Sequence, residues 1–342
     1  MNIIASVASA LLLALALPNE FAPFGIAFVS FFALAPYFAA VIRSKSCKEA
    51  ALLGAIFGSL SHAASSYWLF FFEDFAFWTI GSTSIAYGFL HIFVAIFLRR
   101  FSLGFSVFRK EKISINPVQN TLETQNILRP FLLALVWTLW EYHKSIGFFG
   151  YPWGLVAYGV NYYPQMIQIT DTTGVYGLSF LLALSSSIIA EAGIRFRSLK
   201  KLHSPVYRSI LVFMSIFIWF SVYGKIRLEN PTPVVDRVPI ILVQHNADSW
   251  ETSELEALSK LVDLTRSALE EYEARHQGSK PALIVWSETV LRRPFQHYRM
   301  YFRDNPDHDP LIPLLKEFGV PLLTGAPEIL DWDTYEATNS AI

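Results

Sequence analysis

Charged residues are scarce in this sequence: Asp, Glu, Lys and Arg make up 16% of its 342 residues, against about 25% in an ordinary soluble domain. The deficit is confined to residues 1–225, where apolar runs alternate with short polar pieces. Residues 226–342 carry charge at ordinary density. A net charge of −1 excludes nucleic-acid binding driven by bulk electrostatics. The sequence therefore predicts a membrane domain followed by a soluble domain.

Cysteine is nearly absent, since Cys47 is the single one, and this excludes an intrachain disulfide. Cys47 lies in a short basic stretch, and we interpret it as an ordinary loop thiol. Glycine-rich phosphate loops, HExxH and GxSxG are also missing. The residues Asp304, Asp307, His308 and Asp309 have no recognised ligand spacing and fit a solvated loop better than a metal site. We expect neither a metal nor a cofactor.

The first 225 residues contain seven apolar segments near the roughly 20 residues that a spanning helix needs. They lie at about 3–18, 22–42, 50–72, 76–98, 130–148, 174–194 and 208–224. The first also fits a signal peptide, but it has no Lys or Arg before its apolar run and continues through a turn at residues 18–20 into the second. We therefore favour a retained helix and a domain of about seven transmembrane helices.

Basic residues set the expected orientation, because cytoplasmic loops carry an excess of Lys and Arg. The loops after the second, fourth and sixth segments are the basic ones; they contain Arg43, Lys45, Lys48, Arg99, Arg100, Arg109, Lys110, Lys112, Arg195, Arg197, Lys200, Lys201 and Arg208. The N-terminus is then cytoplasmic, and seven crossings put the soluble domain outside. This predicts a multi-pass membrane protein with its soluble domain outside the cytoplasm, opposite Cys47.

Polar residues inside spans are costly and mark candidate functional positions; here they are His62, His91 and Glu141. Glu141 fits either a substrate path near the outer face or an interfacial side chain that reaches to the headgroups. Residues 147–154, GFFGYPWG, break the helical pattern with Gly and Pro. They fit a re-entrant element or an interfacial loop equally well.

The soluble part alternates buried strands and helices, which predicts a layered α/β sheet. Strands are expected at 238–244, 282–287 and 320–326, with helices at 252–275 and 310–318. Residues 339–342 have the pattern of a strand that has just begun. An apolar strand left unpaired is an exposed sheet edge, so we expect this domain to be incomplete.

Glu288 follows the apolar run at residues 282–287. A buried strand that ends on a carboxylate holds a general base rigidly at the rim of a sheet. The alternative is a surface carboxylate that happens to follow a strand. Beside several membrane spans, Glu288 suggests chemistry on a lipid or a lipid-attached substrate.

Ordered motifs along the chain resemble the apolipoprotein N-acyltransferase family, in which a membrane domain precedes a nitrilase-like αββα sandwich of the carbon–nitrogen hydrolase type. The motifs are LALP at 15–18, AP at 35–36, GAIFG at 54–58, YWL at 67–69, WE at 140–141, GYPW at 150–153, GVYGLSF at 174–180, VQHN at 243–246, VWSET at 285–289 and LTGA at 323–326. They cover essentially the whole chain in order. The resemblance implies a membrane domain at 1–225 and the N-terminal part of a nitrilase-like domain at 226–342.

The resemblance also implies an activity. A cysteine takes a fatty acyl group from a membrane phospholipid as a thioester and passes it to the N-terminal α-amine of a diacylglyceryl-cysteine lipoprotein. Glu288 matches the glutamate base of the family's Glu–Lys–Cys triad, whose lysine stabilises the oxyanion. Trp250, Trp153 and Glu141 are the candidate substrate-binding residues. The implied partners are the phospholipid donor, the lipoprotein acceptor and the bilayer. The implied location is the bacterial inner membrane, with several spans and with the soluble domain on the periplasmic side.

The family's lysine and cysteine are not among these residues, which predicts either a fragment of a longer reading frame, the favoured alternative, or a truncated and inactive copy. Two other functions stay open: a lipid- or lipoprotein-binding membrane protein without activity, and a membrane-anchored nitrilase-type amidase.

Overall fold

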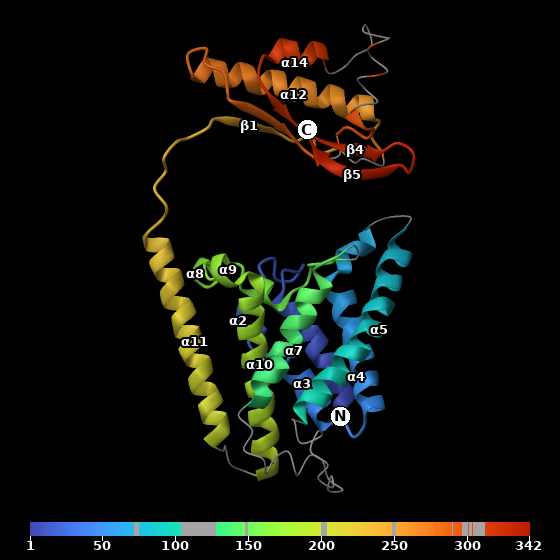
Figure 1. The fold of residues 1–342 in the computed structure, drawn as a ribbon, viewed down its shortest axis with the longest axis vertical. Helices are drawn as coiled ribbons and strands as arrows, with labels where there is room; N and C mark the ends of the chain where they lie inside the picture. The colour runs from blue at the N-terminus through green and yellow to red at the C-terminus, as the bar shows by residue number, and fades with distance from the viewer. Residues whose placement is uncertain are drawn as a thin grey trace. The chain divides into compact units, whose positions relative to one another are not determined.

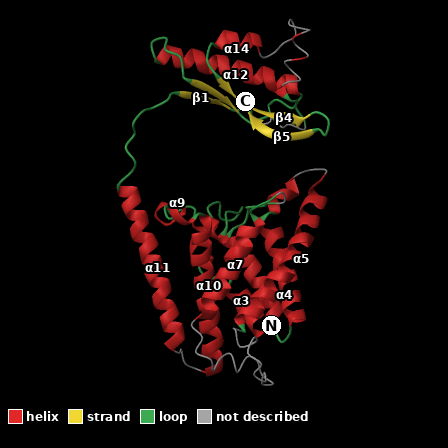
Figure 2. Ribbon diagram, viewed as in Figure 1, coloured by secondary structure: helices red, strands yellow, loops and turns green. Residues whose placement is uncertain are grey.

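The computed structural model describes residues 1–71, 75–103, 128–147, 150–199, 204–247, 251–288, 290–295, 300, 303 and 312–342. The chain forms two compact units, Met1–Pro231 and Thr232–Ile342. The first is built from helices, and the second combines helices with strands (Figure 1 and Figure 2). The division falls six residues after the boundary at 225 that the sequence indicates.

The first apolar segment forms α1, Asn2–Ala16, and the second divides into two helices, α2 (Ala27–Ser30) and α3 (Ala35–Arg43). Pro36 lies in the first turn of α3. This is where proline favours a new helix start, because the missing N–H has no helical acceptor there. The turn after α1 is built on Asn19, whose side-chain oxygen accepts hydrogen bonds from the backbone N–H groups of Phe21 and Ala22, both at 2.9 Å.

The helix α4 covers Cys47–Ser65 and begins at a cap that resembles a capping box. Ser46 Oγ accepts from the Glu49 N–H at 3.2 Å, and the Glu49 carboxylate accepts from the Lys45 N–H at 2.7 Å. The short 3-10 helix η1, Tyr67–Phe71, follows.

Among the residues that the structure describes, three helices are long and apolar enough to cross a membrane: α5 (Ala76–Ser102), α10 (Val175–Leu199) and α11 (Ser204–Glu229). In its most apolar 18-residue window α10 is 72% buried, whereas α5 is 22% buried and α11 is 17% buried. The surfaces of α5 and α11 are therefore largely exposed, while α10 is enclosed by neighbouring helices. These helices fit a membrane protein; the seven-span count and the orientation stay predictions.

The remaining long helix of this unit is α7, Leu128–Lys144. It is joined to α10 by a buried group of charges, in which Arg129 Nη2 lies 2.5 Å from Glu191 Oε1 and Arg195 pairs with the same carboxylate. After α7 come the 3-10 helix η4 (Val156–Val160) and two short helices, α8 (Pro164–Ile167) and α9 (Thr170–Thr173). Gly174 has φ +62° and separates α9 from α10.

The second unit contains a parallel three-stranded sheet in the order β1 (Ile240–Val243), β2 (Leu283–Trp286), β3 (Leu322–Leu323). In its register Val243 lies opposite Trp286, and Val285 lies opposite Leu323. The helices α12 (Glu254–Arg275) and α14 (Ile312–Phe318) cover one face of this sheet (Figure 1). The strand–helix alternation of the sequence thus gives an α/β unit; a nitrilase-like sandwich stays a proposal.

The predicted strand at 320–326 is wrong in one respect, because the chain changes partners within it. β3 ends at Leu323, and β4 (Gly325–Asp331) pairs antiparallel with β5 (Glu336–Ala341). Thr324 between them exchanges backbone hydrogen bonds with Ile342, at 3.0 and 2.9 Å. The strand expected from residue 339 begins at Glu336, and β4 occupies one of its edges.

Candidate functional site

The carboxyl ends of the three parallel strands meet at one edge of the sheet, where β1 is followed by Gln244 and His245, β2 by Ser287 and Glu288, and β3 by Thr324. Parallel α/β sheets place their ligands at this edge. The strand β2 is central in the sheet, so the side chain that follows it has neighbours on both sides.

Buried residues hold the backbone on either side of Glu288. Trp286 is 3% exposed, and its Nε1–H donates to Thr265 Oγ1 of α12 at 2.9 Å. Val290 is 1% exposed. Glu288 itself is exposed. A fixed backbone with an accessible carboxylate suits proton transfer to and from a bound substrate.

One oxygen of the Glu288 carboxylate accepts a hydrogen bond from the side-chain amide of Asn339 on β5. The amide fixes the orientation of the carboxylate and leaves the second oxygen for a substrate proton. No sequence motif predicts that Asn339 lies near Glu288, because the proximity of the two residues depends on the β4–β5 hairpin. The sequence treats it only as the start of a strand.

A second pair lies beside Glu288: Ser287 Oγ is 3.3 Å from His245 Nδ1. Burial, and then the charges of Lys260 and Arg292, lower the pKa of His245, so His245 is neutral near pH 7. The contact links the segment after β1 to the segment after β2. It therefore supports the backbone on which Glu288 is carried.

Of the tentative substrate-binding residues, Glu141 is 1% exposed. Its Oε1 accepts from Trp137 Nε1 at 3.0 Å and from the Val156 N–H at 2.8 Å. An interfacial side chain reaching to the headgroups is thus the wrong interpretation, because the carboxylate is enclosed and holds η4 against α7. Contact of Glu141 with substrate stays a proposal.

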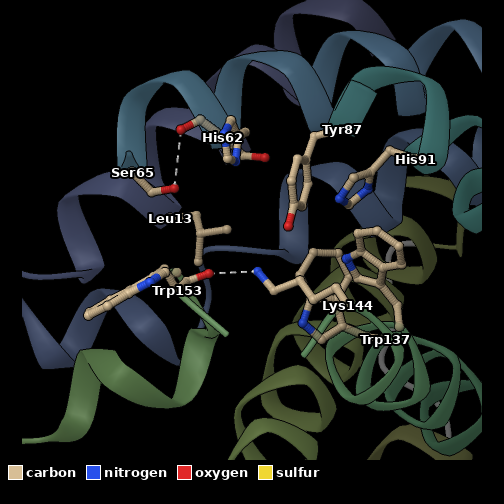
Figure 3. A pocket seen from close by; sticks show the side chains of 11 residues that line it. Leu13, His62, Ser65, Tyr87, His91, Trp137, Lys144 and Trp153 are labelled. Carbon is tan, nitrogen blue, oxygen red and sulfur yellow. Dashed lines mark hydrogen bonds between the residues drawn. The ribbon is translucent and has the colours of Figure 1, made fainter. Parts of the chain in front are cut away.

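Trp153 is 57% exposed, and its ring packs edge-on against Trp68 with the centroids 6.0 Å apart. Its carbonyl oxygen accepts a hydrogen bond from Lys144 Nζ at 2.9 Å, which ties this loop to the end of α7 (Figure 3). The loop also binds the Glu141 carboxylate through Val156. Trp250 lies outside the described residues, as do Asp304, Asp307, His308 and Asp309.

Lys144 borders a small polar cavity in the first unit, together with His62, Tyr87 and His91 (Figure 3). The His62 and Tyr87 rings stack with centroids 4.2 Å apart, and His62 Nε2 lies 3.0 Å from Thr83 Oγ1. The cavity measures about 20 Å³, room for roughly one water molecule. It is too small to enclose a lipid headgroup.

Among the described residues no group of three or more His, Cys, Asp or Glu side chains is arranged to hold a metal ion. At the sheet edge Glu288 is an exposed carboxylate that can accept a proton, with Asn339, His245 and Ser287 beside it. Cys47, half-buried at the first residue of α4, belongs to the other unit.

Comparison with known proteins agrees with the ordered motifs. Residues 9–188 match the model of the apolipoprotein N-acyltransferase N-terminal domain. The chain belongs to the apolipoprotein N-acyltransferase family. Apolipoprotein N-acyltransferase 2 of Treponema pallidum (strain Nichols) is 33% identical over 95% of this chain and 57% of its own length.

Other members of the family give similar matches. Apolipoprotein N-acyltransferase 2 of Treponema denticola is 32% identical over 96% of this chain and 59% of its own length. Apolipoprotein N-acyltransferase of Borreliella burgdorferi is 27% identical over 94% of this chain and 57% of its own length. The chain thus spans between 57% and 59% of the length of these relatives.

Proposed function

We propose that the protein to which this chain belongs is a membrane N-acyltransferase that transfers a fatty acyl group from a phospholipid to the N-terminal α-amine of a diacylglyceryl-cysteine lipoprotein. The observation that carries the proposal is the exposed Glu288 carboxylate, held by Asn339 at the carboxyl end of the central strand. The relatives' name supports the acceptor class. The apolar helices support a reaction at a membrane, where both lipid substrates reside.

In the proposed reaction Glu288 takes the proton of a cysteine thiol as its sulfur attacks the ester carbonyl of the phospholipid. The C–O bond breaks, the lysophospholipid leaves with the proton, and a thioester remains. The lipoprotein amine then attacks the thioester, Glu288 accepts the amine proton, and the thiol is regenerated as the amide forms. A lysine stabilises the oxyanion in both steps.

The family resemblance places the thiol and the lysine outside the 342 residues of this sequence. Cys47 is the single cysteine of the sequence and is predicted to lie on the opposite side of the membrane from Glu288. It therefore does not serve as the nucleophile. The proposed activity is that of a protein in which both groups are supplied.

The test uses that intact protein, reconstituted with phospholipid whose acyl chain carries a label, and a synthetic diacylglyceryl-cysteine peptide. The expected products are a labelled, hydroxylamine-sensitive thioester on the enzyme and, after peptide is added, a peptide heavier by one acyl group. Cys47→Ser is expected to leave both signals unchanged. If the protein hydrolyses small amides and transfers no acyl group from phospholipid, the proposal is wrong and the protein is a membrane-anchored nitrilase-type amidase.

A further inference from the structure

A groove of about 510 Å³ lies between α5 and α7. Its walls are mainly apolar and include Leu90, Phe93, Phe97, Phe101, Leu135 and Leu139. Phe93, Phe97 and Leu139 are each about half exposed, at 49%, 56% and 56%. Because α5 is one of the helices apolar enough to cross a membrane, the groove opens toward lipid tails.

Each wall of the groove is about as long as the hydrocarbon part of one bilayer leaflet is thick. On α5 its lining runs from residue 90 to residue 101, and on α7 from residue 132 to residue 143, about 16 Å each at 1.5 Å per residue. Half of a bilayer's hydrocarbon core is about 15 Å. Tyr87 packs on Trp140 and His91 on Trp137, so the two helices run antiparallel and their walls overlap along part of their length.

The apolar walls of the groove suit a hydrocarbon chain as its occupant. An acyl chain is narrow and flexible enough to follow a wall of Leu and Phe side chains. The groove therefore suits a lipid tail.

A cationic side chain lies beside one end of the groove. Arg100 precedes the lining residue Phe101 and is exposed, and it has no hydrogen bond or ion pair to any residue that the structure describes. Its neighbour Arg99 differs, because it is buried and donates to the carbonyl oxygen and hydroxyl of Ser44. The guanidinium of Arg100 is thus available to a phosphate, which it can bind through two N–H groups.

We propose that α5 and α7 hold one anionic glycerophospholipid, with an acyl chain in the groove and its phosphate at Arg100. The basic end of α5 is predicted to face the cytoplasm, whose leaflet is rich in anionic lipids. This lipid is therefore a resident structural lipid rather than the acyl donor. The proposal does not depend on the proposed enzymatic activity.

The chain, purified in a mild detergent, is equilibrated with equal amounts of phosphatidylglycerol and phosphatidylcholine and examined by native mass spectrometry. We expect one retained phosphatidylglycerol per chain. Leu135→Trp fills the groove and is expected to reduce retention at least fivefold. The matched control is Leu211→Trp on α11, where Leu211 is 68% exposed and does not line the groove; its retention stays at the wild-type level.

Two further variants test the headgroup contact. Arg100→Gln is expected to abolish the preference for phosphatidylglycerol over phosphatidylcholine, and Arg100→Lys to preserve most of it. Leu139→Trp repeats the groove test if Leu135→Trp does not fold. The proposal is overturned if a folded groove variant retains as much phosphatidylglycerol as the wild type, or if Leu211→Trp loses as much as the groove variants. It is also overturned if the preference for phosphatidylglycerol survives Arg100→Gln, or if a second copy of the chain binds in place of the lipid.

Discussion

Asn339 donates a hydrogen bond from its side-chain amide to the carboxylate of Glu288, across 51 positions of sequence. Asn339 lies on β5, and Glu288 is the second residue after β2. The hairpin β4–β5 is therefore part of the site, because it carries the group that orients the proposed base.

Replacing Asn339 with Ala in the intact protein removes this orientation without removing the carboxylate. We predict that the rate of thioester formation falls by about 10- to 100-fold, since a displacement of roughly 1 Å at a reacting group costs about 100-fold, while the KM for phospholipid changes little. Single-turnover acylation measures the rate. Ser340→Ala is the neighbouring control, because Ser340 Oγ bonds Glu328 at 3.0 Å rather than Glu288. Equal losses in both variants would assign Asn339 a purely structural role.

Glu141 joins η4 to α7, and its removal tests that link. Glu141→Ala leaves two buried donors, Trp137 Nε1–H and Val156 N–H, without their acceptor, at a cost of about 1–3 kcal/mol for each. Glu141→Gln keeps an acceptor oxygen and is expected to lose less. Thermal unfolding in detergent compares the two with Glu229→Ala, which changes an exposed carboxylate of α11. Equal unfolding temperatures for Glu141→Ala and Glu141→Gln would contradict the role of Glu141 in holding η4 against α7.

The close packing of α4 on α5 depends on glycine. A Cβ added at Gly54 would lie 2.2 Å from the carbonyl oxygen of His91, so Gly54→Ala forces the helices apart, at a cost of about 1–3 kcal/mol. Gly81→Ala is the control, because a Cβ at Gly81 meets no atom of the described residues within 4 Å. There the higher helix propensity of Ala adds about 1 kcal/mol of stability. Thermal denaturation should move the two variants in opposite directions; a stable Gly54→Ala would contradict the packing.

His245 gives the second unit a pH dependence of known sign. Its folded-state pKa lies below the ordinary value of about 6.5, because of burial first and then Lys260 and Arg292. The unfolded chain therefore takes up the proton first as pH falls, and this site's contribution to stability decreases below about pH 6.5 until the folded-state pKa is reached. NMR titration of labelled histidine, assigned with His245→Gln, measures the pKa. Lys260→Ala should raise it, and a wild-type value above 6.5 would contradict this account.

The sequence predicted most of the parallel sheet because its strands and helices have strong, uninterrupted patterns: Ile240–Val243, Leu283–Trp286 and Glu254–Arg275 all fall inside predicted segments. It missed the change of partner at Thr324, since a continuous apolar run does not reveal which strand each half pairs with. The sequence also did not predict that the segment 22–42 divides into α2 and α3, because the apolar run continues through the break between them.

For the site, strand position and the family motifs indicated Glu288, whereas Asn339 became visible only through the hairpin that brings it close. Glu141 was recognised as unusual because it is a carboxylate in an apolar helix. Its partners Trp137 and Val156 were not predicted, since the bond to Val156 crosses a loop whose path depends on tertiary packing.

The central claim is that Glu288 is the general base, and thioester labelling of the Glu288→Gln variant tests it most directly. The intact protein carrying this substitution is compared with Glu328→Gln, which removes another carboxylate of the same unit. We predict that Glu288→Gln folds normally and forms no labelled thioester from phospholipid, while Glu328→Gln is labelled like the wild type. Normal thioester labelling of a folded Glu288→Gln variant would contradict the claim.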